Sequence, residues 1–181
     1  LDQINRKNVS FNNVRKLKTN PDAKSHFYDL SNFSFSYAFG IMNQTNAQIQ
    51  DYSYKTYRGN ITYSFQPKAL TIEPFKNAGF LDSPHLRLIK DFNLNLSPTL
   101  VLARLDIDRK HLRSQYRNDQ LSTAGVDPLF QKSFFMNRFY SVNWDLTKNL
   151  RVDYTGSIMA VVDEPQGDLD TEQKSDSVRY N

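Results

Sequence analysis

Three histidines and one acidic segment are the residues of this chain whose types could bind a metal. His26, His85 and His111 lie far apart, without His-x-x-x-His or related spacing, so each is expected to be an ordinary loop residue. Residues 163–170 read Asp-Glu-Pro-Gln-Gly-Asp-Leu-Asp, which could form a calcium loop. The segment lacks the ligand order and terminal Glu of an EF-hand, so a turn ending a strand is favoured over calcium binding.

The chain offers no recognisable catalytic constellation. It has no nucleophile elbow, P-loop or dinucleotide fingerprint, and the spacing of its Ser, His and Asp residues does not favour a triad. Cysteine is absent, which excludes a disulfide framework and a cysteine-ligated metal site. We therefore predict that the chain is not an enzyme and binds no cofactor.

The elements that organise the chain are alternating strands. Between residues 33 and 41, bulky apolar residues at odd positions alternate with Ser, Ala and Gly at even positions. Because successive side chains of a strand point to opposite faces, one face is apolar and the other is small and polar. Similar runs recur along the chain, and no long run has helical spacing, so we predict an all-β fold of antiparallel hairpins. The predicted runs are residues 9–11, 33–41, 57–65, 92–96, 100–107, 140–146 and 150–162.

The predicted connections differ in length. Residues 97–99 and 147–149 read as tight turns, whereas 67–84 and 111–132 are long and polar, and the segment from 163 onward is longer still. This alternation predicts an up-and-down meander whose short turns all lie at one end and whose long loops lie at the other. Outer-membrane barrels have this arrangement, with short periplasmic turns.

The polar positions indicate which way the apolar face points. They carry mostly Asn, Ser and Thr, with some Asp and Arg, rather than the Lys and Glu of a face in bulk water. The runs reach about 9–11 residues, the length a tilted strand needs to cross a bilayer. There is no apolar run of about 18 residues that would predict a transmembrane helix. The alternative is a soluble β-sandwich whose aromatic face forms its core.

Specific residues are assigned to the two faces of the predicted wall. We predict that the lipid-facing residues are Phe33, Phe35, Tyr37, Phe39, Ile61, Tyr63, Phe65, Val142, Trp144, Val152 and Tyr154. The predicted lumen-facing residues are Asn60, Thr62, Ser64, Asn93, Asn95, Asn143, Asp145, Asp153 and Thr155. The aromatics expected near strand ends, in interfacial girdles, are Tyr52, Tyr54, Phe92, Phe139 and Trp144.

The charge of the chain does not indicate nucleic-acid binding. The net charge is +4 and the pI about 9.2, but the basic residues are scattered among Asp rather than gathered in a stripe. Arg15, Lys16 and Lys18 form a small basic cluster, interpreted as a solvated strand end or a contact with lipid headgroups. The mixed charges between 104 and 117 predict ion pairs. The chain begins without an apolar leader region, which we expect of a mature chain or a fragment.

Several ordered segments carry a family resemblance. They are NVRKLKTNPDAKSHFYDLSNFSFSYAF at 13–39, YRGNITYSF at 57–65, EPFKN at 73–77, IKDFN at 89–93, RLDIDR at 104–109, NWDLTKNLRVDYT at 143–155 and DEPQGDLDT at 163–171. In this order they resemble the SprA/Sov family, the outer-membrane translocon of the type IX secretion system in gliding and secreting Gram-negative bacteria. Members of that family are far longer than this chain, and the largest known single-chain barrels have about 36 strands.

The resemblance implies that residues 1–181 form one wall segment, of about seven strands, within a very large transmembrane β-barrel. Such a barrel exports folded cargo proteins that carry a C-terminal signal domain across the outer membrane. The implied partners are that cargo, a small barrel-type shuttle protein, a periplasmic plug protein and outer-membrane lipid. The rival expectation, which the residue pattern leaves open, is a soluble β-sandwich adhesin or carbohydrate-binding module.

Overall fold

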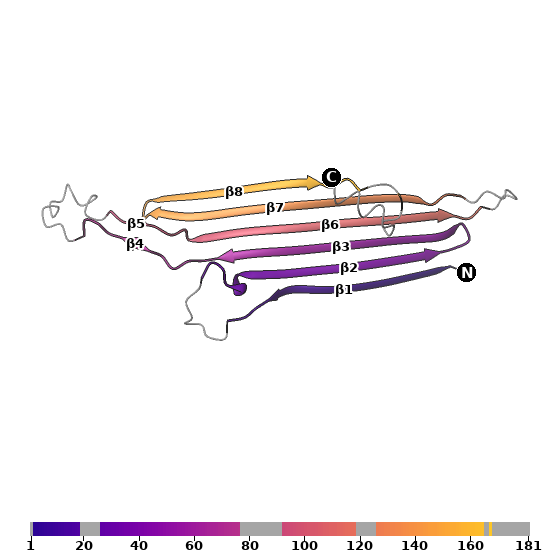
Figure 1. Cartoon of the computed structure of the whole chain (residues 1–181), viewed down its shortest axis with the longest axis horizontal. Helices are drawn as coiled ribbons and strands as arrows, with labels where there is room; N and C mark the ends of the chain where they lie inside the picture. The colour runs from indigo at the N-terminus through magenta and orange to yellow at the C-terminus, as the bar shows by residue number, and fades with distance from the viewer. Residues whose placement is uncertain (1, 19–25, 77–91, 119–125, 165–166, 168–181) are drawn as a thin grey trace.

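A six-stranded antiparallel sheet forms the body of the molecule in the computed structural model (Figure 1). The structure describes residues 2–18, 26–76, 92–118, 126–164 and 167. The strand order is β1-β2-β3-β6-β7-β8, so neighbours in the sheet follow one another along the chain. The strands are β1 (Gln3–Arg15), β2 (Phe33–Thr45), β3 (Ile49–Phe65), β6 (Leu100–Tyr116), β7 (Leu129–Thr147) and β8 (Leu150–Val161).

Two short strands, β4 (Thr71–Ile72) and β5 (Leu94–Asn95), pair with each other in a separate ribbon. The ribbon extends the β3–β6 hairpin beyond the end of the main sheet (Figure 1). A single 3-10 turn, η1 (Leu30–Asn32), precedes β2. No helix in the described ranges is long and apolar enough to cross a membrane.

The predicted all-β, antiparallel fold is confirmed, but the sheet is not closed into a barrel. β1 and β8 lie at opposite edges, and each pairs with a neighbour on one side only among the described strands. Outer-membrane barrels of single chains need at least about eight strands to close. Six strands therefore leave an open, single-layer sheet.

The prediction of a wall strand at 92–96 was wrong. Only Leu94 and Asn95 are extended, and they pair with β4 rather than with a strand of the main sheet. The segment 97–99 is not a reversal, since β5 and β6 run in the same direction (Figure 1). Instead, hydrogen bonds of this segment hold the break between β5 and β6 in place. Ser97 Oγ accepts a hydrogen bond from Leu70 N, and Thr99 N donates one to Asn143 O.

The predicted segregation of short and long connections was also wrong. The β7–β8 turn is tight, but it lies at the same end of the sheet as the long β1–β2 and β3–β6 connections (Figure 1). The other end carries the tight β2–β3 turn, in which Asn46 Oδ1 accepts from Ile49 N at 2.7 Å. The connection predicted at 111–132 is shorter, because β6 continues to Tyr116 and β7 begins at Leu129.

The first strand is longer than its weak apolar pattern predicted. β1 spans 13 residues and contains a bulge between Phe11 and Val14. Asn13 adopts a positive φ of 52° there, which Asn tolerates better than most residues, and its N–H donates to Ser36 Oγ at 2.9 Å.

The β1–β2 connection is fixed where it re-enters the sheet. Asp29 accepts a hydrogen bond from the His26 backbone N–H, and its carboxylate lies 3.3 Å from Lys18 Nζ. These contacts, the backbone hydrogen bond first, hold the pKa of the Asp29 carboxyl below its ordinary value. Tyr63 Oη donates to Phe27 O, which ties the connection to β3.

Candidate functional site: the two faces of the sheet

Cross-strand register places the apolar residues together on one face of the sheet. Residues directly opposite each other share a face, and Phe35 opposes Ile61, which opposes Leu105 on β6. We call this surface the apolar face. Eleven residues named from sequence lie on it: Phe33, Phe35, Tyr37, Phe39, Ile61, Tyr63, Phe65, Val142, Trp144, Val152 and Tyr154. What this face contacts stays a prediction.

Aromatic rings line up across the strands of the apolar face. The ring centroids of Phe33 and Tyr63 are 4.9 Å apart, and those of Phe39 and Tyr57 are 5.1 Å apart. Such cross-strand pairs stabilise a sheet by about 0.2–1 kcal/mol each. The face is otherwise uncovered: no large side chain of the described residues is fully buried, and Phe35 remains 45% exposed.

The opposite surface, which we call the polar face, carries the hydroxyl, amide and charged side chains. Asn60 opposes Asp106, and Asn143 opposes Asp153, so the polar positions of four strands come together. The residues predicted to face the lumen that lie here are Asn60, Thr62, Ser64, Asn143, Asp145, Asp153 and Thr155.

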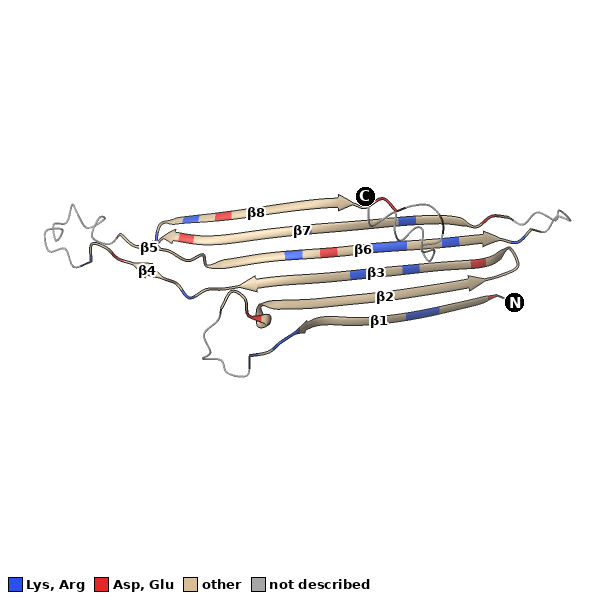
Figure 2. Cartoon of the chain, in the orientation of Figure 1, with Lys and Arg blue, Asp and Glu red and all other residues tan. Residues whose placement is uncertain are grey.

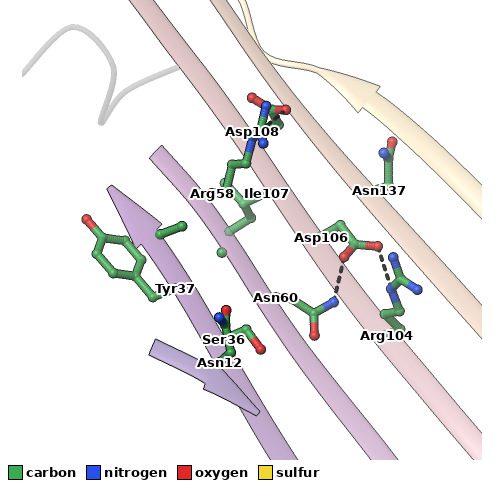
Figure 3. Close-up of a pocket in the computed structure, with 12 residues that line it drawn as sticks. Asn12, Ser36, Tyr37, Arg58, Asn60, Arg104, Asp106, Ile107, Asp108 and Asn137 are labelled. Atoms are coloured by element: carbon green, nitrogen blue, oxygen red, sulfur yellow. Dashed lines mark hydrogen bonds and ion pairs between the residues drawn. The ribbon is translucent and has the colours of Figure 1, made fainter. Parts of the chain in front are cut away.

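The charges of the polar face are matched in pairs. Asp106 accepts from Asn60 Nδ2 at 2.5 Å and from Arg104 Nε at 2.7 Å, as drawn in Figure 3. Arg58 lies 3.5 Å from Asp108, beside the same network. These residues line a shallow hollow of about 450 Å³ that crosses β2, β3, β6 and β7. Its two arginines and two aspartates balance, so the hollow offers polarity without net charge.

A second ion-pair cluster lies at the start of β8. Arg151 Nε is 3.0 Å from Asp153 and 3.7 Å from Asp145, and Asp145 also accepts from Thr99 Oγ1. Within the described residues no group of three or more metal-ligating side chains comes together. The ion pairs predicted between 104 and 117 are present and lie in β6.

Two residues predicted to face the lumen lie elsewhere. Asn95 belongs to the β4–β5 ribbon and Asn93 directly precedes β5, so neither is part of the main sheet. Asn93 is buried and accepts from Lys148 N, while Asn95 accepts from Thr71 Oγ1 and donates to Asp145 O at 2.6 Å. Trp144 Nε1 donates to the Asn95 carbonyl. Both asparagines therefore fasten the ribbon to the β7–β8 turn.

This fastening gives the first expected result. Asn95→Ala removes two side-chain hydrogen bonds, each worth about 1 kcal/mol, so the β4–β5 ribbon should open more often. Limited proteolysis of the variant protein should show faster cleavage within residues 66–99 than in the unaltered protein. Thr62→Ala, on the main sheet, is the control. Equal cleavage rates in all three proteins would contradict the role of Asn95.

The aromatics predicted in interfacial girdles are divided between surfaces. Tyr52, Tyr54 and Phe139 lie on the polar face, because their partners are Ser114, Leu112 and Arg104. Trp144 lies on the apolar face, and Phe92 precedes the ribbon. Whether a residue lies near a strand end does not determine its face of the sheet. The face is determined by whether its position along the strand is odd or even.

The histidines and the basic residues named from sequence lie in different parts of the fold. His111 is a buried strand residue of β6 rather than a loop residue, and His26 lies in the β1–β2 connection. His85 and most of the segment 163–170 lie outside the described residues. Arg15 ends β1, and Lys18, beyond it, pairs with Asp29.

Sequence reasoning missed that the apolar face carries basic side chains along part of β6. Beyond Ile107, the odd positions of β6 become Arg109, His111 and Arg113. The same odd-even alternation that identified the apolar positions continues through these residues, so parity could have placed them.

Comparison with known proteins adds no further identification, since no protein-family model matches the chain and no curated protein matches it.

Proposed function

We propose that this chain is a wall segment of a very large outer-membrane β-barrel through which the type IX secretion system exports folded proteins. The observation that carries the proposal is the uncovered apolar face of an unclosed sheet. Ile61 is 42% exposed, Val152 46% and Tyr154 60%, and the described residues supply no second layer over them. An apolar surface of this extent requires a covering partner, and lipid fits a face that is apolar along several adjacent strands.

The backbone arrangement supports the same proposal. Within the main sheet, β2, β3, β6 and β7 each pair on both sides, so their N–H and C=O groups are satisfied between strands. This is the requirement for chain that crosses hydrocarbon, where water is absent. The outer edges of β1 and β8 would be satisfied by neighbouring strands of the same barrel.

The polar face suits the wall of a wide aqueous conduit. Its hydroxyl and amide groups can hydrogen-bond to water, and four of its charges pair locally as Arg58–Asp108 and Arg104–Asp106. Folded cargo of either net charge would meet no large field of one sign on this surface.

The assignment to type IX secretion depends on the resemblance to the SprA/Sov family across 13–171. In this proposal the partners are cargo proteins with a C-terminal signal domain, a small barrel-type shuttle, a periplasmic plug and outer-membrane lipid. The proposed location of the protein is the outer membrane of a Gram-negative bacterium. The rival, a soluble β-sandwich adhesin or carbohydrate-binding module, would need a second sheet over the apolar face, and the described residues form only one layer.

Cysteine accessibility along β3 tests the proposal directly. The segment has no cysteine of its own, so each introduced thiol reports one position. In outer-membrane vesicles, a water-soluble maleimide should label cysteines at Asn60, Thr62 and Ser64, because these side chains face water. Cysteines at Ile61 and Tyr63 should stay unlabelled until the membrane is dissolved in detergent, because lipid covers them.

Two outcomes would contradict the proposal. Uniform labelling of both sets would mean that water reaches both faces. Labelling of both sets without any association of the protein with membranes would favour the soluble sandwich.

A further inference from the structure

A row rich in basic residues crosses the apolar face near the β2–β3 turn. Register places Lys7, Ile41, Lys55, His111 and Lys132 opposite one another across β1, β2, β3, β6 and β7. Figure 2 shows basic residues on β1, β3, β6 and β7, but none on β2, in the half of the sheet that contains the β2–β3 turn. On β2 and β3 the aromatic and aliphatic side chains of this face give way at the row to polar and charged ones, whereas β6 and β7 already carry Arg109 and Arg138 on the same face.

Strand length explains why the change occurs there. β3 has 17 residues and at about 3.3 Å each spans roughly 56 Å. Tilted by about 45°, it rises about 40 Å, which exceeds the roughly 30 Å of the hydrocarbon core. One end of the strand therefore leaves the hydrocarbon, and the basic row lies at the level expected for headgroups.

A hollow of about 320 Å³ lies on the apolar face at this row. Its polar lining consists of Lys55 and His111 in the row, with Asn43, Ser53, Arg113 and the carboxylate of Asp51 further along the strands. Arg113 lies 3.3 Å from Asp51 through Nη1, while its Nε is buried and donates no hydrogen bond. Among the described residues, no carboxylate pairs with Lys55.

The neighbouring row offers no comparable site. Arg109 is paired with Glu164 and lies 5.8 Å from the centroid of the Tyr57 ring, so its charge is already engaged. In the hollow Arg113 also faces a carboxylate, that of Asp51, but its Nε donates no hydrogen bond, and Lys55 beside it is paired with no described carboxylate, so donors remain available next to apolar surface. A phosphate accepts hydrogen bonds from such donors more strongly than a neutral group does.

We propose that this hollow binds the phosphate of an anionic lipid, with Lys55 and Arg113 as its main donors. The inference rests on the proposed membrane function and adds a specific headgroup site to it. A lipid fits better than free phosphate, because Ile41 and Phe39 continue the apolar surface directly from the hollow along β2. The acyl chains would lie on that surface.

Lipid retention by the full-length protein tests the site. The protein is reconstituted in nanodiscs of phosphatidylcholine with a minority of phosphatidylglycerol, and bound phosphatidylglycerol is measured by native mass spectrometry. Each Lys or Arg near a membrane surface changes binding of anionic lipid by about 5-fold. Lys55→Gln should therefore weaken retention about 5-fold, and Lys55→Gln with Arg113→Gln about 30-fold.

Lys110→Gln is the matched control. Lys110 lies on the same strand as Arg113 but on the polar face, opposite Thr56 and Ser133, so its loss should leave retention unchanged. Excess inorganic phosphate should also leave retention unchanged, because it lacks acyl chains. If the double variant fails to assemble, the retention of phosphatidylglycerol by the Lys55→Gln variant alone tests the headgroup site.

The failure of this inference differs from the failure of the proposed function. If the protein inserts in membranes but Lys55→Gln and Lys110→Gln retain phosphatidylglycerol equally, the headgroup site is wrong and the wall segment stands. Displacement of the lipid by inorganic phosphate would also overturn the lipid site. A protein that does not insert at all overturns both proposals.

Discussion

An arginine in place of Phe35, Ile61 or Val152 is expected to block assembly of the full-length protein in the outer membrane. The three positions lie on the apolar face and are 42–46% exposed. In the proposed wall each would place a guanidinium in hydrocarbon. The cost is about 2–4 kcal/mol at the bilayer midplane and falls toward the interfaces. A loss of that size would strongly reduce the assembled fraction in outer-membrane preparations, measured by heat-modifiable migration on gels.

The matched controls are Ser64→Arg and Asn143→Arg. Both positions lie on the polar face, on the same strands or their neighbours, where the new charge would meet water and, at Asn143, also the opposing Asp153. Assembly should be nearly unchanged, since surface substitutions usually shift stability by about 0.5 kcal/mol or less. Equal loss of assembly at both sets would indicate that the two faces have the same surroundings, contrary to the proposed orientation.

The faces of the sheet were predictable from sequence because side-chain direction in a strand depends only on odd or even position. At residues 33–41 and 57–65, the apolar residues occupy odd positions and the register keeps them together. A shift of register by one residue would have mixed Phe35 with polar side chains. The same rule correctly placed Asn60 and Asp153 on the opposite face.

Strand ends were less predictable because the chemistry of the faces changes along each strand. β6 continues through Arg109, His111 and Arg113, where the alternation is basic rather than apolar. β1 includes Gln3, Asn5 and Lys7 on the apolar face, so its pattern is weak although its backbone pairs with β2 along its length except at the bulge between Phe11 and Val14. In the proposed wall, the part of a strand that extends beyond the hydrocarbon needs no apolar side chains to keep its hydrogen bonds.

The β4–β5 ribbon could not be recognised from periodicity alone. The segment 92–96 alternates as a wall strand does, and Pro98 suggested a reversal after it. The contacts that decide its position come from distant residues: Thr71 and Asp145 bind Asn95, and the Leu96 N–H donates to Leu70 O. Such long-range hydrogen bonds leave no local signal in the sequence.

The isolated segment is expected not to fold as a soluble, monomeric domain. Its sheet has two open edges, at β1 and β8, that present unpaired backbone groups to other chains. β1 is exposed along its whole length, and Phe11, at 56%, and Tyr154, at 60%, show how much apolar surface remains uncovered near the two edges. Expressed alone without detergent, the chain should aggregate or remain unfolded.

Circular dichroism and size-exclusion chromatography of the isolated chain provide the measurement. In water we expect no cooperative thermal transition from a monomeric peak, whereas detergent should increase the β-signal by covering the apolar face. The substitutions Phe35→Ser and Tyr154→Ser supply a control, because lower apolar exposure should reduce aggregation without producing a stable fold, as the edges remain open. A detergent-free monomer with a cooperative transition would require a second apolar layer from the residues outside the described ranges. That result would favour the β-sandwich and overturn both the wall segment and its role in secretion.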